Sequence, residues 1–162
     1  MGLSEVSSIL WRERQLLELL LFKLEEEQLL LSAGRTRWLS HATREVERVL
    51  AQIKQGEMAR AMEVEAVAAE LGLPPGPSLG QLIDAASEPW KGILGDHREA
   101  FLTLTQEITA LSQLNRDLLN RGYLATRDAL SWFGDSAAEP ETYSANGSSA
   151  LAAAPRLLDR VI

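Results

Sequence analysis

Residues 94–115, LGDHREAFLTLTQEITALSQLN, decide the fold of this chain of 162 residues. Their apolar side chains recur at alternating intervals of three and four residues, which places them along one face of an α-helix. The register extends in the C-terminal direction, and its successive seam positions are Leu94, His97, Phe101, Leu104, Ile108, Leu111, Asn115, Leu118, Gly122, Ala125, Ala129 and Trp132. At about 1.5 Å per residue, the expected helix over residues 88–133 is roughly 70 Å long. A seam of this length predicts an elongated coiled coil.

A second long helix is expected at the N-terminal end of the chain, over residues 4–32. Ser4 is its expected N-cap, and Gly34 follows its last turn. Its seam positions are Leu3, Val6, Leu10, Leu17, Leu20, Leu24 and Leu31. Because Ile9, Leu16, Leu21 and Leu30 widen this stripe, we expect the helix to contact two neighbouring helices rather than one.

A third long helix is expected over residues 36–71, because the sequence Gly72-Leu-Pro-Pro-Gly-Pro77 cannot continue it. Its expected buried positions are Leu39, Ala42, Val46, Val49, Leu50, Ile53, Met62, Val64, Val67, Ala68 and Leu71. The apolar pattern is weaker around Gly56, where we expect the helix to bend or fray.

A short helix over residues 79–86 is expected to connect the long helices, because Ser78-Leu-Gly-Gln81 is a capping-box pattern. Together these patterns predict an all-α protein. Its expected architecture is an elongated antiparallel three-helix coiled coil, or bundle, with a short helical insert, formed by residues 1–134. Residues 135–162 are rich in Ser, Ala, Glu, Pro, Thr, Asn and Gly, which predicts a flexible C-terminal tail.

The charge and composition exclude several classes of function. Sixteen Lys and Arg residues against twenty-three Asp and Glu residues give a net charge of −7, which disfavours nucleic-acid binding. The absence of cysteine excludes a disulfide framework and a thiolate metal site. The chain begins without a basic signal-peptide region, and its apolar run near residues 16–24 is interrupted by Glu18 and Lys23. We therefore expect a cytoplasmic protein that does not insert into a membrane.

The sequence also lacks the patterns of an enzyme, a metal site or a cofactor site. Its two histidines, His41 and His97, are far apart and have no ligand-spacing motif around them. His97 falls on the long seam, so we expect a hydrogen-bonded core or boundary side chain. The connector over residues 72–80 contains three prolines and no lysine, which excludes a Walker-type phosphate loop.

Three further features have a structural and a functional interpretation. For Asn115 on the seam, we favour a role in fixing the helix register over a binding role. For Glu25-Glu-Glu27, we favour a solvated face over acid–base catalysis. For the tryptophans at positions 11, 38, 90 and 132, we favour core packing over a ligand box.

The C-terminal residues Leu157, Leu158, Val161 and Ile162 would form one apolar face if this segment were helical. A peptide this short is not a stable helix in water. It therefore needs a groove or helix to bind, supplied by a partner protein or by the body of this chain. The alternative interpretation is a tail that is merely disordered.

The turn-forming sequence Pro140-Glu-Thr-Tyr-Ser-Ala-Asn-Gly147 precedes this hydrophobic end, and Leu111-Ser-Gln-Leu-Asn115 lies in the last long helix. With the long N-terminal helical pair, these features resemble the FlgN family of bacterial flagellar type III export chaperones. The Tyr-x-Ala-Asn-Gly element, residues 143–147, is the specific part of the resemblance.

The resemblance implies a cytoplasmic chaperone rather than an enzyme. It implies binding of the C-terminal helices of the hook–filament junction proteins FlgK and FlgL, and delivery to the export gate protein FlhA and the soluble export ATPase components. Tyr143, Asn146 and Gly147 are the expected gate-docking residues. For client binding we expect the apolar tail residues Leu151, Leu157, Leu158, Val161 and Ile162. The alternative is a structural coiled-coil adaptor without chaperone activity.

Overall fold

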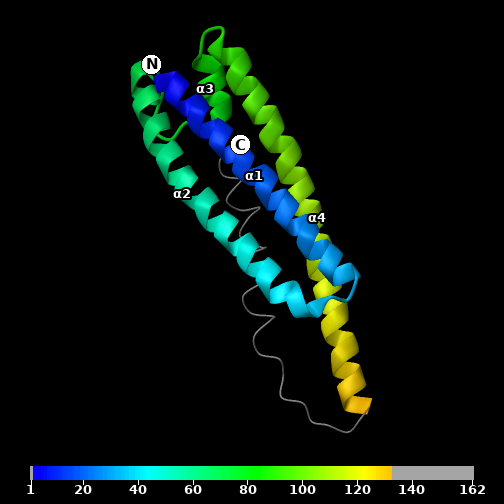
Figure 1. The fold of residues 1–162 in the computed structure, drawn as a ribbon. Coiled ribbons are helices and arrows are strands. Elements are labelled where there is room, and N and C mark those ends of the chain that lie inside the picture. Colours follow the sequence, from blue (N-terminus) through cyan, green and yellow to red (C-terminus); the bar gives the residue numbers. More distant parts are fainter. Residues whose placement is uncertain (1, 133–162) are drawn as a thin grey trace.

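The computed structural model describes residues 2–132. The chain forms α1 (Gly2–Ser32), a 3₁₀ turn η1 (Thr36–Trp38), α2 (Leu39–Leu71), α3 (Leu79–Ala85) and α4 (Trp90–Trp132) (Figure 1). Over the described residues the fold is all-α, with three long helices and one short helical insert, so the predicted fold class is confirmed. The predicted tail, residues 135–162, lies outside this range.

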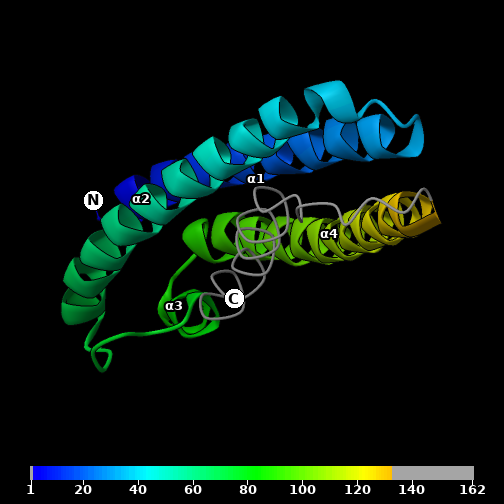
Figure 2. The same ribbon diagram turned by 90° about the horizontal axis from the view of Figure 1, so that it is seen from below.

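Helix α1 lies between α2 and α4 and packs along both of them, as the width of its apolar stripe predicted (Figures 1 and 2). Helix α2 runs back along α1, whereas α4 runs in the same direction as α1. Two contacts fix this parallel register, from Ser7 to His97 and from the Leu24 carbonyl to Asn115. Each residue of α1 therefore lies level with the residue of α4 that is about 90 positions later in the sequence.

The core follows the seams of the three long helices. From α1 the buried apolar side chains are Val6, Leu10, Leu17, Leu20 and Leu24. From α2 they include Val46, Val49, Ile53 and Val67, and from α4 Leu94, Phe101 and Ile108. The seams therefore identify most of the buried positions. Burial of these aliphatic and aromatic side chains is the main stabilising contribution to the fold.

Some expected details of the helices are wrong. Helix α1 begins at Gly2, so Ser4 is not its N-cap, and the Ser4 hydroxyl instead donates a hydrogen bond to the Glu5 carboxylate. Met62 is 77% exposed and Leu71 is 37% exposed, although both were expected on the buried face of α2. The helix is continuous through Gly56, so the expected fraying is wrong, while the alternative of a bend there stays a prediction.

The connections between the helices follow the local sequence. Gly72 ends α2 with a left-handed φ of 68°, a conformation that glycine adopts without steric cost. The predicted capping box is confirmed: the Ser78 hydroxyl accepts a hydrogen bond from the Gln81 amide, and the Gln81 side chain accepts one from the Ser78 amide. Helix α3 then packs against α4 at the end of the bundle where α4 begins (Figure 2).

The C-terminal part of α4 extends beyond the rest of the bundle (Figure 1). With the offset of about 90 residues, the end of α1 at Ser32 lies level with Gly122 of α4. Gly122, Ala125 and Ala129 are exposed, so their predicted place in a packed seam is wrong for the described residues. The predicted helix does continue through these three residues, but α1 and α2 are too short to cover this part of α4.

Candidate functional site

The residues predicted to bind a client or the export gate all lie outside the described part of the chain. They are Tyr143, Asn146, Gly147, Leu151, Leu157, Leu158, Val161 and Ile162. Residues 2–132 therefore show the body to which these predicted sites are attached. Within this body, the notable features are a cavity beside α3, two buried carboxyl groups on α1, and the extension of α4.

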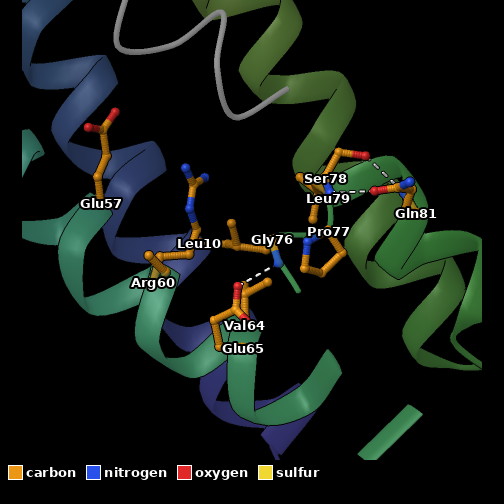
Figure 3. Close-up of a pocket in the computed structure, with 11 residues that line it drawn as sticks. Leu10, Glu57, Arg60, Val64, Glu65, Gly76, Pro77, Ser78, Leu79 and Gln81 are labelled. Carbon is orange, nitrogen blue, oxygen red and sulfur yellow. Dashed lines mark hydrogen bonds between the residues drawn. The ribbon is translucent and has the colours of Figure 1, made fainter. Parts of the chain in front are cut away.

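The cavity lies between α2 and the segment that leads into α3, and Leu10 of α1 also lines it (Figure 3). Its volume is about 280 Å³. The described lining residues are Leu10, Glu57, Arg60, Ala61, Val64, Glu65, Gly76, Pro77, Ser78, Leu79 and Gln81. The two walls are joined by a hydrogen bond that the Gly76 amide donates to the Glu65 carboxylate (Figure 3). The sequence did not predict this cavity, because its walls come from three separate elements.

An ion pair lies beside this cavity, between α1 and α2. Arg60 Nη1 is 2.9 Å from Glu13 Oε2, and these side chains are only 9% and 6% exposed. Burial raises the pKa of the Glu13 carboxyl to about 7, although the positive charge of Arg60 opposes the rise. Burial also raises the pKa of the nearby Glu57 carboxyl. Gly56 faces the pair, since a Cβ there would lie 3.5 Å from Glu13 Cγ.

A second polar layer crosses the bundle near the end of α1. Glu27 is 1% exposed, and its carboxylate accepts a hydrogen bond from the Thr43 hydroxyl of α2 at 3.5 Å. The expectation of a solvated Glu25-Glu-Glu27 face is therefore wrong for Glu27, although Glu25 is exposed. Burial raises the pKa of the Glu27 carboxyl to about 7. This carboxyl is consequently protonated more readily than an exposed one.

Asn115 of α4 lies in the core at the same end of the bundle. Its side chain is fully buried, and its Nδ2 donates a 2.9 Å hydrogen bond to the Leu24 carbonyl of α1. One amide side chain thus joins α4 to a single position on α1. This geometry agrees with the predicted role in fixing the register between the helices.

His97 occupies the outer side of the contact between α1 and α4. It is 6% exposed, its Nε2 lies 3.3 Å from the Ser7 hydroxyl, and burial lowers its pKa. This confirms the expected core or boundary role. Trp11 packs edge-on against the His97 ring but is 51% exposed, and Trp38 is 52% exposed. The expectation that these two tryptophans belong to the core is therefore wrong.

Residues 2–132 hold no cluster of three or more His, Cys, Asp or Glu side chains that could bind a metal ion. Over the same range, no helix is long and apolar enough to cross a membrane. The buried carboxyl groups of Glu13 and Glu27 contact side chains of α2.

A comparison with protein families gave one finding that covers most of the chain. The model of the family described as FlgN protein matches residues 1–150. This match includes all of the described body and also Tyr143, Asn146 and Gly147, and it ends just before Leu151. Comparisons with curated proteins and with solved structures gave no match.

Proposed function

This chain belongs to the FlgN family, a family of flagellar export chaperones, and on that premise we propose that it binds the hook–filament junction proteins FlgK and FlgL. In this proposal it covers their C-terminal helices in the cytoplasm, prevents their premature association, and delivers them to the export gate protein FlhA and the soluble export ATPase components. In this proposal the protein has no catalytic activity and requires no cofactor. The observation that carries the proposal is the family match over residues 1–150.

The proposed client site is the apolar tail formed by Leu151, Leu157, Leu158, Val161 and Ile162. Client helices that assemble later in the filament junction expose apolar faces beforehand, and a second amphipathic segment can cover such a face. The exposed end of α4 supports this arrangement, because it leads from the packed body directly into the tail. Ordering the tail on the client would reduce the net affinity, which suits a client that must later be released.

The proposed gate-docking site is Tyr143 with Asn146 and Gly147. A tyrosine in a turn-forming segment offers a large amphipathic ring, a side chain that often dominates interface energetics. Because the site is separated in sequence from Leu157 and Ile162, one chain could hold its client and contact the gate simultaneously. This separation also makes the two activities separable by mutation.

Calorimetric titration with the C-terminal segment of FlgK or FlgL tests the client site. We expect the full chain to bind, and we expect truncation after Gly147 to leave the bundle folded while weakening binding at least tenfold. Leu158→Asp should weaken binding similarly, whereas the matched control Asp159→Ser, off the apolar face, should not. Unchanged affinity after truncation would move the client site onto the helical body. No binding by the full chain would favour the adaptor alternative.

Capture of the chaperone–client complex by the cytoplasmic domain of FlhA tests the docking site. Tyr143→Ala should retain helicity and client affinity but reduce capture, while the neighbouring control Ser144→Ala should behave like the unmodified chain. Full capture by Tyr143→Ala would refute the docking role. Loss of client binding in that variant would instead place Tyr143 in the client site.

A further inference from the structure

The cavity beside α3 has an apolar lining and an excess of negative charge. Leu10, Val64 and Leu79 are among its apolar lining residues, whereas Glu57 and Glu65 line it as carboxylates (Figure 3). Arg60 is the one basic side chain among the described lining residues, where Glu57 and Glu65 outnumber it, and it also pairs with Glu13 at 2.9 Å. A complementary occupant would therefore combine aliphatic side chains with unpaired positive charge.

Residues 156–162 of the same chain have this chemistry. Their sequence, Arg-Leu-Leu-Asp-Arg-Val-Ile, provides four aliphatic side chains that share one face in a helical conformation. Arg156 and Arg160 lie off that face, where long guanidinium side chains can extend to carboxylates at the rim of a cavity. The segment thus matches both the apolar and the acidic parts of the lining.

The chain is long enough for this segment to reach the cavity. The register between α1 and α4 places Leu10 level with Phe101, and the 31 residues from Phe101 to Trp132 cover about 47 Å of helix. The 24 residues from 133 to 156 can span up to about 80 Å when extended. A tether of this length permits contact within one molecule and gives the segment a high effective concentration at the cavity.

We propose that residues 156–162 dock into the cavity lined by Leu10, Val64 and Leu79, and that a client must displace them from it. The effect on client binding rests on the proposed function, because the apolar face of residues 156–162 that docks into the cavity must also be the face that binds the client. Docking itself does not depend on that function. The apparent client affinity would equal the intrinsic affinity multiplied by the fraction of molecules in which the segment is released.

A paramagnetic label on the tail tests the docking directly. The chain contains no cysteine, so Asp159→Cys provides a single attachment site on the polar side of the segment. With a nitroxide attached, we expect the methyl signals of Val64 and Leu79 to broaden strongly. The signals of Leu124, on the exposed end of α4, should broaden much less. Strongest broadening near Ile93, on the outer α1–α4 surface, or no selective broadening, would overturn the proposal.

Two variants make this test specific. Val161→Asp in the tail should abolish the broadening at Val64 without affecting the folded body. On the other side of the contact, Ala61→Lys adds a positive charge at an exposed position of the lining and should reduce the broadening. Ala66→Lys, exposed on α2 but absent from the described lining, is the matched control and should preserve it. Equal broadening in all three variants would contradict docking at this cavity.

Two further measurements separate the alternatives. In the first, chain that carries the nitroxide but no isotopes is mixed with isotope-enriched chain that carries no nitroxide, and the signals of the enriched chain should not broaden. Strong broadening would show that the occupant of the cavity is the tail of a second copy and would overturn docking within one molecule. In titrations with a FlgK or FlgL C-terminal segment, Ala61→Lys should bind about three- to tenfold more tightly than Ala66→Lys, and equal affinity would overturn the competition. If no client segment binds the unmodified chain, the proposed function fails, while the broadening still decides whether the tail docks.

Discussion

Glu13 of α1 and Arg60 of α2 form an ion pair that is almost completely excluded from solvent, with 2.9 Å between Oε2 and Nη1. Glu13 lies between Leu10 and Leu17 in the α1 register, so a charged pair occupies a seam position between two apolar ones. Such a pair contributes little net stability compared with apolar packing, because both charges lose their hydration. A shift in the helix packing that left either Glu13 or Arg60 buried without the other would, however, be strongly destabilising.

The first prediction concerns this pair. Arg60→Met should destabilise the fold by about 3–5 kcal/mol at pH 8, because the buried Glu13 carboxyl must then either take up a proton or remain charged without a partner. The double variant Glu13→Leu/Arg60→Met should recover most of that loss. Urea unfolding of both proteins measures the difference, with the exposed Arg48→Met as the control. A double variant as unstable as Arg60→Met would contradict this explanation.

The second prediction concerns the pH dependence that Glu27 contributes. Its folded-state pKa of about 7 lies above the usual value of 4.5, so the folded state binds this proton more tightly than the unfolded chain. The resulting stabilisation is fully present below pH 4.5 and is lost as the pH rises through 7. For this buried group, the shift corresponds to a free energy on the order of 3 kcal/mol.

Glu27→Leu tests this contribution, because the variant removes the titrating group and keeps an apolar side chain at the seam. Its stability should therefore fall less between pH 5 and pH 8 than that of the unmodified chain. At pH 8 the variant should be the more stable of the two. Urea unfolding at both pH values gives the comparison, with Glu25→Leu, at an exposed position, as the matched control. An unaltered pH dependence in Glu27→Leu would show that this carboxyl ionises normally.

The third prediction concerns Asn115. Asn115→Ala should destabilise the bundle by about 1–2 kcal/mol, because it removes a buried hydrogen bond to the Leu24 carbonyl and leaves a small void. The matched control Asn120→Ala, at an exposed position of α4, should change the unfolding free energy by about 0.5 kcal/mol or less. If both variants unfolded alike, Asn115 would have no register-fixing role.

The fourth prediction concerns the seam of α4. Ile108→Asp should destabilise the fold by several kcal/mol, on the order of 3 or more, because Ile108 is fully buried. Leu104 is only partly buried, so Leu104→Asp should have a smaller effect. Thermal unfolding can rank both against Gln106→Asp on the exposed face of the helix. A thermal midpoint that is insensitive to Ile108→Asp would mean that the register of α4 is wrong.

The sequence predicted the helices well because their apolar spacing and their end signals agree. Ser78 with Gln81, and Gly72 before two prolines, set the helix ends through local chemistry that needs no knowledge of the rest of the fold. The seam spacing of α1 likewise identified Leu10, Leu17 and Leu24 as core positions.

The sequence did not predict features that depend on how distant elements meet. Glu13 and Glu27 occupy regular seam positions of α1. In the sequence alone, each carboxylate looks like an interruption of the apolar seam, because its partner on α2, Arg60 or Thr43, is not known. The seam of α4 continues past Gly122, although its partners end at that level. The lengths of the helices, 31 residues for α1 and 43 for α4, were the signal that could have predicted this extension.

The most direct test of the proposed chaperone function is the export of the junction proteins from flagellated cells that naturally produce this chain. After deletion of its gene, the amounts of FlgK and FlgL in the culture medium should fall sharply, while another flagellar export substrate remains unchanged. The full chain should restore both proteins, and Tyr143→Ala should not. Undiminished FlgK and FlgL in the medium of the deletion strain would contradict the account.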